Sequence, residues 1–464
     1  MTTTSKARTR AAATKKKTAT RKTARKPETL SKSDSPDKAT LRSYQVGFGD
    51  CYLLTFHYGD ERRHILIDFG STALPKHAPQ DQMLRVAEDI RRRSEGKLHI
   101  LVATHRHKDH ISGFATNAAG DAPGDIIRQC EPDVIIQPWT EDPDAQPDAT
   151  HATARLSRQN RAFAASLLNM QFTSAAVKAE AAHLRLGLSK RVADELAFLG
   201  EDNLSNRSAI ENLIRMGKRR GARTLYVNYD FDRPLKLESL LPGVRVRVLG
   251  PPNLEQSQAI TKQRSSDPNE FWQLQARAGL SATLGESPLF PSAPSESASH
   301  LTPAYTRWFI RRMHRTRGSQ LLQIVRILDS VMNNTSVILL FEAGRKKLLF
   351  PGDAQIENWS YALSKPEVTE MLAGVDVYKV GHHGSRNANP KTLWQLFDKK
   401  NPKKSPARLR TFVSTMEGKH GDPDRKTEVP RESLVEALKL LSDYFTTQDL
   451  QGENALSEAF TINL

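Results

Sequence analysis

Short apolar runs separated by polar or glycine-containing segments dominate the first part of the chain, and runs of this length predict strands. They occupy residues 44–56 (interrupted by a glycine-rich turn), 63–70, 98–103 and 133–139. Between the second and third runs, Met83, Val86, Ala87 and Ile90 recur at helical spacing, with charged residues between them. This spacing predicts a helix with one apolar face. Strands followed by a helix and another strand indicate a mixed α/β domain built in layers.

A second series of apolar runs lies further along the chain. It occupies residues 225–227, 244–249, 336–342, 347–350, 376–380 and 410–414. Gly344 stands between two of these runs and predicts a hairpin there. We expect 410–414 to be the last core strand, and Pro430 to open a closing helix over 429–441.

Two segments interrupt the strands, and we treat them as insertions at about 145–222 and 254–331. The first is rich in Ala, Leu, Arg and Glu at helical spacing. The second is dense in Ser and Pro near 280–300, which predicts a loop. It then turns helical and carries the basic cluster Arg311–Arg317, which is either a phosphate-contacting face or an ordinary solvated one. The ordered domain is expected to span residues 41–464.

The first forty residues form a distinct basic tail, with twelve Lys/Arg against three Asp/Glu. They contain almost no large apolar side chain, so they cannot bury enough surface to offset the entropy of ordering. We therefore expect residues 1–40 to be disordered. The tail is either a nucleic-acid-binding arm, since cations neutralise phosphates, or a solubilising extension. No apolar segment follows it, which argues against a secretory signal, and a mitochondrial-type transit peptide is a minor alternative.

The 464-residue chain has a formal net charge of +16. A second basic segment, Lys399–Arg408, is either a loop that follows a nucleic-acid backbone or a solvated linker. No apolar stretch approaches eighteen residues, so no membrane span is expected. The two cysteines, Cys51 and Cys130, are too few and too far apart for a disulfide framework. We expect both to be buried in a protein of the reducing cytoplasm.

The segment Thr104–His110 carries the strongest chemical signal. It places His105, His107, Asp109 and His110 directly after the apolar run 98–103. Imidazole and carboxylate groups are the ligands that zinc and related metals take. Four such side chains at this spacing, at the mouth of a strand, predict a metal site.

Further ligand-type residues follow two later strands. Asp353 comes after 347–350, and His382 and His383 come after 376–380. All three strand ends could converge on one edge of the domain. A metal there would lower the pKa of a bound water to about 7, so hydrolysis is the implied reaction, with Asp109 and Asp353 as the catalytic carboxylates.

These motifs, in this order, resemble the metallo-β-lactamase superfamily. The resemblance rests on Gly47–Asp50, Leu66–Gly70, Thr104–His110 and Phe350–Ala354. Tyr378–Ser385 and the first segment are most similar to the soluble β-lactamase-like domain of ComEC competence proteins. The resemblance implies a four-layer αββα sandwich and one or two divalent metals, usually zinc and sometimes manganese.

The resemblance also implies roles for individual residues. One ion would take His105 and His107, and a second would take Asp109, His110 and one of His382 or His383. Asp353 would bridge the two ions. Asp68 would orient a ligand, Asp50 would lie near the metals or only shape the turn, and His420 resembles a late histidine of the group. Apart from the resemblance, Lys379 and Ser385 flank the histidine pair and either contact a phosphate or are ordinary polar loop residues, and Asn334 is a further candidate beside the site.

The chain departs from the family at one place. Many members have a further histidine before the strand that leads to the later aspartate, whereas this chain has Asn333–Ser336. Asparagine is a weak neutral ligand, so the ion on His105 and His107 would be loosely held or absent.

Three functions follow from these observations. The first is a metal-dependent phosphodiesterase, most simply a DNase, which the site and the basic charge favour. The second is a hydrolase of a small ester, lactone or phosphoester, because one fold serves many chemistries. The third is a nucleic-acid-binding protein with a vestigial site. No membrane partner is expected.

Overall fold

The structure is a computed structural model, and it describes residues 35–142, 207–257, 259, 331–419, 428–450, 452 and 455–464. The tail up to residue 34, most of both insertions, the basic cluster Arg311–Arg317 and His420 lie outside the described residues.

One sheet contains seven strands in the order β13-β1-β2-β3-β4-β5-β6. The four strands from β13 to β3 are antiparallel to one another, and the strands from β3 to β6 are parallel. Their bounds are Lys38–Tyr44 (β1), Cys51–Tyr58 (β2), Glu61–Phe69 (β3), Ile100–Val102 (β4), Val134–Pro138 (β5), Arg223–Val227 (β6) and Ser457–Asn463 (β13).

The other sheet contains six strands in the order β12-β11-β10-β9-β8-β7. The predicted hairpin around Gly344 is confirmed, because β8 and β9 pair in antiparallel fashion. The strands from β9 to β12 are parallel. The bounds are Val244–Gly250 (β7), Ile338–Ala343 (β8), Lys346–Phe350 (β9), Val377–Lys379 (β10), Arg410–Val413 (β11) and Asp443–Thr446 (β12).

A hydrophobic cluster holds the two sheets together. The ring centroids of Phe56 in β2 and Phe341 in β8 lie 6.3 Å apart, and those of Tyr52 in β2 and Phe350 in β9 also lie 6.3 Å apart. Alternate residues along each strand point into this cluster, as the period of two along a strand requires.

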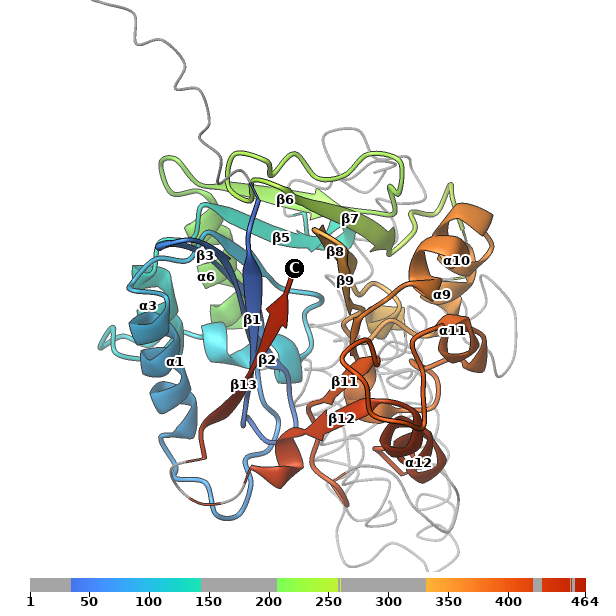
Figure 1. Ribbon diagram of the computed structural model, residues 1–464. Coiled ribbons are helices and arrows are strands. Elements are labelled where there is room, and N and C mark those ends of the chain that lie inside the picture. The colour runs from blue at the N-terminus through green and yellow to red at the C-terminus, as the bar shows by residue number, and fades with distance from the viewer. Residues whose placement is uncertain are drawn as a thin grey trace, which may run out of the picture.

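Helices cover the outer faces of the sheets (Figure 1). A second cluster packs α1 (Gln82–Arg93), α3 (Pro123–Gln129) and α6 (Arg207–Gly217) on the first sheet. A third packs four helices on the second sheet: α9 (Ile356–Leu363), α10 (Pro366–Ala373), α11 (Lys391–Leu396) and α12 (Glu432–Leu441). The predicted mixed α/β domain is therefore confirmed.

Three predicted boundaries are wrong. Strand β1 begins at Lys38, because residues 38–40 pair with both β2 and β13, so the ordered domain starts before residue 41. Helix α6 belongs to the main core and not to an insertion, since Ala209, Leu213 and Met216 are buried against the first sheet. The run 410–414 is not the last core strand, because β12 and β13 follow it.

Both missed strands are edge strands, which need fewer apolar residues because one side of the backbone faces away from the sheet. Within the described residues, no helix is long and apolar enough to cross a lipid bilayer.

Candidate metal centre

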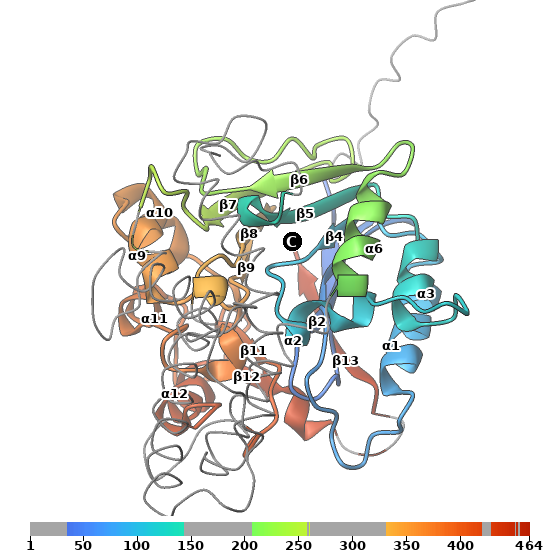
Figure 2. The same cartoon turned by 180° about the vertical axis from the view of Figure 1, so that it is seen from behind.

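Ligand-type side chains gather where strands of both sheets end. Asp68 closes β3, the histidine motif follows β4, and Asp353 and His383 follow β9 and β10. Since β3 and β4 are parallel neighbours, as are β9 and β10, their C-terminal ends lie at the same edge. The short helix α2 (Lys108–Ile111) lies at this edge (Figure 2).

Four buried side chains form the principal donor group: Asp109, His110, Asp353 and His383. Each offers one ligand atom, and all four atoms lie within 4.8 Å of one another. Nε2 of His110 lies 3.0 Å from Oδ2 of Asp353, and Nε2 of His383 lies 2.8 Å from Oδ2 of Asp109. Two carboxylates and two imidazoles in this arrangement suit a divalent metal.

The hydrogen bonds of His110 and His383 also suit a metal site. Nδ1 of His110 lies 2.8 Å from Oδ2 of Asp68, and Nδ1 of His383 lies 2.8 Å from the backbone carbonyl oxygen of Ser414. Each Nδ1 therefore carries a proton and donates it. A neutral imidazole has only one N–H, so each Nε2 directs a lone pair at a carboxylate unless the ring is protonated or a cation lies between.

The charges of the buried side chains also favour a bound cation. Burial disfavours the protonated ring, but the carboxylates of Asp353, Asp68 and Asp109 raise the pKa of His110 well above its usual value. Burial opposes ionisation of Asp353 as well, yet His110, His382 and Lys379 hold its pKa well below the usual range. The carboxylates of Asp353 and Asp109 thus stay charged and need positive charge beside them, which a divalent cation would supply.

A second donor group contains His105, His107 and Asp109. Nε2 of His105 lies 3.0 Å from Nδ1 of His107. Burial and the neighbouring rings of His110 and His107 lower the pKa of His105 well below its usual value, which keeps the imidazole neutral and able to act as a ligand. Asp109 belongs to both donor groups, whereas Asp353 belongs to one, so bridging by Asp353 stays a prediction.

Asn333 occupies the place beside His107. Its Oδ1 lies 3.1 Å from Nδ1 of His107. Asn334, the neighbour that we expected near the site, instead donates from Nδ2 to Glu357 at 3.3 Å. Asn333 and not Asn334 therefore lies beside His107, and spacing could not distinguish them because it does not give side-chain direction in the turn before β8.

The two adjacent histidines, His382 and His383, differ in burial and in their contacts. His383 is fully buried and joins the principal group. The His382 side chain keeps 22% of its surface exposed, and its Nε2 lies 3.7 Å from Oδ2 of Asp353. His382 contributes its backbone N–H to Oδ1 of Asp353 at 3.1 Å. Between the two alternatives, the donor geometry therefore favours His383.

Three residues of the centre have left-handed backbone conformations that are unusual outside glycine. The φ angles are 55° at Asp68, 45° at His382 and 53° at His383. Strain of this kind costs about 1–3 kcal/mol per residue and persists where surrounding structure imposes it.

Asp68 and Asp50 lie behind the donor groups. Asp68 accepts the backbone N–H and the hydroxyl of Thr104, both at 2.8 Å, in addition to its bond with His110. Asp50 forms an ion pair with Nζ of Lys379, which also donates to the carbonyl oxygen of Gly352 at 3.1 Å. Lys379 is buried, so the structure places it among the carboxylates and not on a surface that a substrate phosphate could reach.

The hydroxyl of Ser385 is buried and has no hydrogen-bond partner within the described residues.

The sequence did not predict two residues that contact His383. They are Ser414, whose carbonyl oxygen accepts from Nδ1 of His383, and Phe48, whose ring centroid lies 4.3 Å from that of His383. Ser414 follows β11, so its strand-end position was the available signal. Phe48 lies inside the glycine-containing turn that the sequence had singled out.

Close backbone packing also shapes the centre. A Cβ on Gly70 would lie 2.5 Å from backbone atoms of Lys108, Asp109 and His110. Only glycine allows the end of β3 to approach α2 this closely.

A comparison with models of known protein families found no match, and a comparison with curated proteins found no similar sequence.

Proposed function

We propose that the protein is a metal-dependent hydrolase whose substrate is a phosphodiester of nucleic acid, most simply DNA. The observation that carries the proposal is the buried group Asp109, His110, Asp353 and His383, with its four ligand atoms within 4.8 Å. One ion would lie in this group, and a second, more weakly held ion would lie beside His105 and His107. Zinc suits the histidine-rich donors best, and manganese is the alternative.

Bound divalent cations supply Lewis acidity, which polarises a phosphoryl oxygen and lowers the pKa of coordinated water. The side chains of the chain itself prepare the site. Asp68 and the Ser414 carbonyl fix the rings of His110 and His383 by accepting their Nδ1 protons. Lys379 balances the charge of Asp50. The Ser385 hydroxyl is buried and has no hydrogen-bond partner among the described residues, so contact between Ser385 and substrate stays a prediction.

The fold that fits this centre is the four-layer αββα sandwich of the metallo-β-lactamase superfamily. Support comes from the three hydrophobic clusters, one between the sheets and one between each sheet and its helices. The positions of the motifs at the ends of β3, β4, β9 and β10 support it too. The similarity to ComEC-type domains remains part of this proposal.

Charge supports a nucleic-acid substrate. The formal net charge of +16 attracts a polyanion at long range, and a small uncharged ester would gain nothing from it. Free buried thiols at Cys51 and Cys130 fit a reducing compartment, so we place the enzyme in the cytoplasm.

The test combines metal analysis with cleavage. Full-length protein would be loaded with Zn²⁺, Mn²⁺ or Mg²⁺ and incubated with labelled single-stranded DNA, double-stranded DNA and RNA. The variants are Asp109→Asn and Asp353→Asn, and the matched control is Asp60→Asn in the exposed turn between β2 and β3. Metal-dependent cleavage that both site variants lose and the control keeps is the expected result.

Two other results would redirect the proposal. Bound metal without cleavage of any nucleic acid would reject the nuclease and favour the hydrolysis of small esters, lactones or phosphoesters. Absence of bound metal, with nucleic-acid binding intact, would reject the hydrolase and favour a binding protein with a vestigial site.

A further inference from the structure

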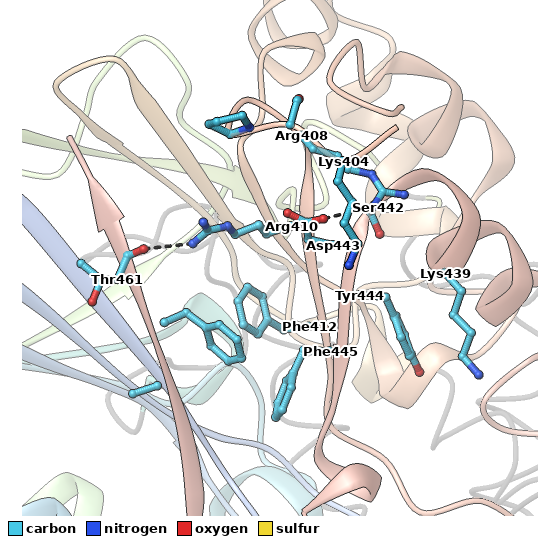
Figure 3. Close-up of a pocket in the computed structure, with 14 residues that line it drawn as sticks. Lys404, Arg408, Arg410, Phe412, Lys439, Ser442, Asp443, Tyr444, Phe445 and Thr461 are labelled. Atoms are coloured by element: carbon cyan, nitrogen blue, oxygen red, sulfur yellow. Dashed lines mark hydrogen bonds and ion pairs between the residues drawn. The ribbon is translucent and has the colours of Figure 1, made fainter. Parts of the chain in front are cut away.

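A pocket of about 890 Å³ lies away from the metal centre, beside the edge strands β12 and β13. Its lining comes from β11, β12, β13, helix α12 and the loop before β11 (Figure 3). Among the described strands, β12 pairs with β11 alone and β13 with β1 alone, so each has one edge that no described strand pairs. The pocket volume falls in the range of about 300–1,000 Å³ that small-molecule sites occupy.

Aromatic rings form one wall of the pocket. The ring centroid of Phe460 in β13 lies 4.8 Å from that of Phe412 and 4.9 Å from that of Phe445. Phe412 is fully buried, whereas Phe445 and Phe460 are only partly buried. Two of the three rings therefore present surface to the pocket. Tyr444 lines the pocket from the opposite face of β12, where it packs with the helices of the second sheet, so it is not part of this wall.

Cationic side chains surround these rings. Among the lining residues, Lys404, Arg408, Arg410 and Lys439 stand against Asp443 as the acidic residue. Arg408 is engaged with Asp443 at 3.1 Å, so this pair is internally balanced. Lys404 and Lys439 are exposed, and the ammonium of Lys439 lies 5.8 Å from the centre of the Tyr444 ring. Arg410 donates to the carbonyl oxygen of Thr461 at 2.9 Å and keeps donors for a ligand.

This site is separate from the metal centre. Arg410 begins β11, whereas Ser414, which holds His383, follows the other end of the same strand. Four residues of strand span about 13 Å, so the pocket and the centre lie at opposite ends of β11. A ligand in the pocket would not contact the proposed metal ligands.

We propose that this pocket binds a nucleotide unit, with its base against Phe445 and Phe460 and its phosphate beside Lys404, Arg410 and Lys439. Flat aromatic surface next to several cations is the combination that nucleic-acid-binding proteins use for base stacking and phosphate contact. The unit is either a free nucleotide or one residue of a single strand.

The Lys399–Arg408 loop gains a role from this site. It was expected either to follow a nucleic-acid backbone or to be a solvated linker, and it contributes Lys404 to the pocket rim. The nucleotide site does not depend on the proposed hydrolase activity, since binding is measured without cleavage.

The test measures binding by fluorescence anisotropy with full-length protein. The probes are a labelled oligothymidylate with non-cleavable phosphorothioate linkages, unlabelled mononucleotides as competitors, and polyglutamate as an anion without bases. The charge variant is Lys404→Gln with Lys439→Gln. Its matched control, Lys236→Gln with Lys391→Gln, removes two exposed lysines elsewhere. A second variant, Phe445→Leu, removes a ring of the wall but no charge, and Tyr444→Leu on the opposite face of β12 is its matched control.

We expect both pocket variants to weaken oligonucleotide binding at least about tenfold, since a stacked base alone contributes that much. Both controls should change binding little. Competition by mononucleotides would identify the free nucleotide as the ligand, and its absence would identify the strand.

Three outcomes would overturn the nucleotide site: no binding, equal loss in pocket and control variants, or competition by polyglutamate that matches the oligonucleotide. Photo-crosslinking with 4-thiothymidine provides an independent readout. Crosslinked peptides should contain β12 or β13, and crosslinks confined to the metal centre would also reject the site.

Discussion

Oδ2 of Asp68 lies 2.8 Å from Nδ1 of His110, and this contact determines which nitrogen of His110 faces Asp353. The carboxylate also accepts two bonds from Thr104, so it cannot rotate away without losing all three partners. A residue that touches no substrate thereby fixes the direction of a proposed metal ligand.

Replacement of Asp68 by Asn should weaken metal binding about 10–100-fold, the usual effect of removing a partner behind a metal-bound histidine. The amide can accept only at its oxygen, so either Thr104 or His110 loses its bond. Isothermal titration with Zn²⁺ measures the affinity. Thr104→Val, which leaves the contact between Asp68 and His110 in place, should have a smaller effect. Unchanged affinity in Asp68→Asn would show that His110 is held by other means.

Gly70→Ala should reduce metal affinity without altering any donor atom. The added Cβ would lie 2.5 Å from the backbone of α2, so the helix that carries Asp109 and His110 must move. Gly59→Ala is a suitable comparison, since no atom lies within 4 Å of its Cβ position, although its φ of 65° adds some strain. Thermal unfolding reports stability, and metal titration reports the site. Equal metal affinity in the two variants would contradict the close-packing argument.

Asn333→His should strengthen the second metal position. The new imidazole would replace an amide oxygen that lies 3.1 Å from Nδ1 of His107, and imidazole is a better zinc ligand than a neutral amide. We expect the metal content by mass spectrometry to rise towards two ions per chain. Asn334→His provides the matched control because that side chain turns towards Glu357. A rise in both variants, or in neither, would argue against His107 as a ligand.

Stability should fall in mildly acidic solution because of His64 and His99. Burial lowers the pKa of each to about 4, whereas the unfolded value is near 6.5. The unfolded chain therefore binds more protons between these values, and stability rises with pH across this window. His64 contributes roughly 2–3 kcal/mol at neutral pH, and this contribution is lost as the pH falls from about 6.5 to about 4.

Urea unfolding at several pH values between 4 and 7.5 measures this effect. His64→Gln should flatten the pH dependence, even if it lowers stability overall. Replacement of the exposed His77 by Gln should leave the slope unchanged. An unaltered slope in His64→Gln would assign the acid sensitivity to other groups.

The buried ion pair between Arg106 and Glu141 should matter more than the exposed pair between Arg62 and Glu95. Both side chains are buried, and the two bonds measure 2.8 and 2.6 Å. Glu141→Gln removes one carboxylate from beside the buried Arg106 guanidinium, and loss of one partner of a buried pair costs up to about 3–5 kcal/mol. Urea unfolding measures the loss. Glu95→Gln, in the exposed pair with Arg62, should cost less than about 1 kcal/mol.

Metal affinity should fall along with stability in Glu141→Gln, because Arg106 stands between His105 and His107 in the motif. A stability change equal to that of Glu95→Gln would mean that the buried pair adds no more than an exposed one.

Sequence patterns predicted the central strands well because the interior of the sheets requires continuous apolar runs. Strand β3 and the hairpin of β8 and β9 appear in the sequence almost as they do in the structure. Strands β12 and β13 were missed. The segment Ser457–Asn463 alternates polar and apolar residues only weakly, and its pairing with β1 arises from contacts across the whole chain.

For the candidate metal centre, as for the strands, the sequence predicted some features and not others. Clustered residue types at strand ends indicated which side chains would meet, since parallel strands end at one edge. Spacing could not decide between His382 and His383, or between Asn333 and Asn334, because each choice depends on backbone torsion in a turn. The left-handed φ angles at both histidines rotate adjacent side chains in ways that local propensity does not anticipate.

The pairing of β1 with β13 has a consequence for biosynthesis. Tyr44 of β1 can pair with Ser457 of β13 only after Ser457 has been synthesised. The β1 edge of the first sheet therefore stays unpaired while the ribosome adds the intervening residues. At about 5–20 residues per second this delay lasts roughly 20–80 s. During that interval the nascent chain exposes a strand edge that could join a neighbouring chain on the same messenger RNA. Slow translation or limited chaperone supply should therefore reduce the yield of folded protein more than the final stability would suggest.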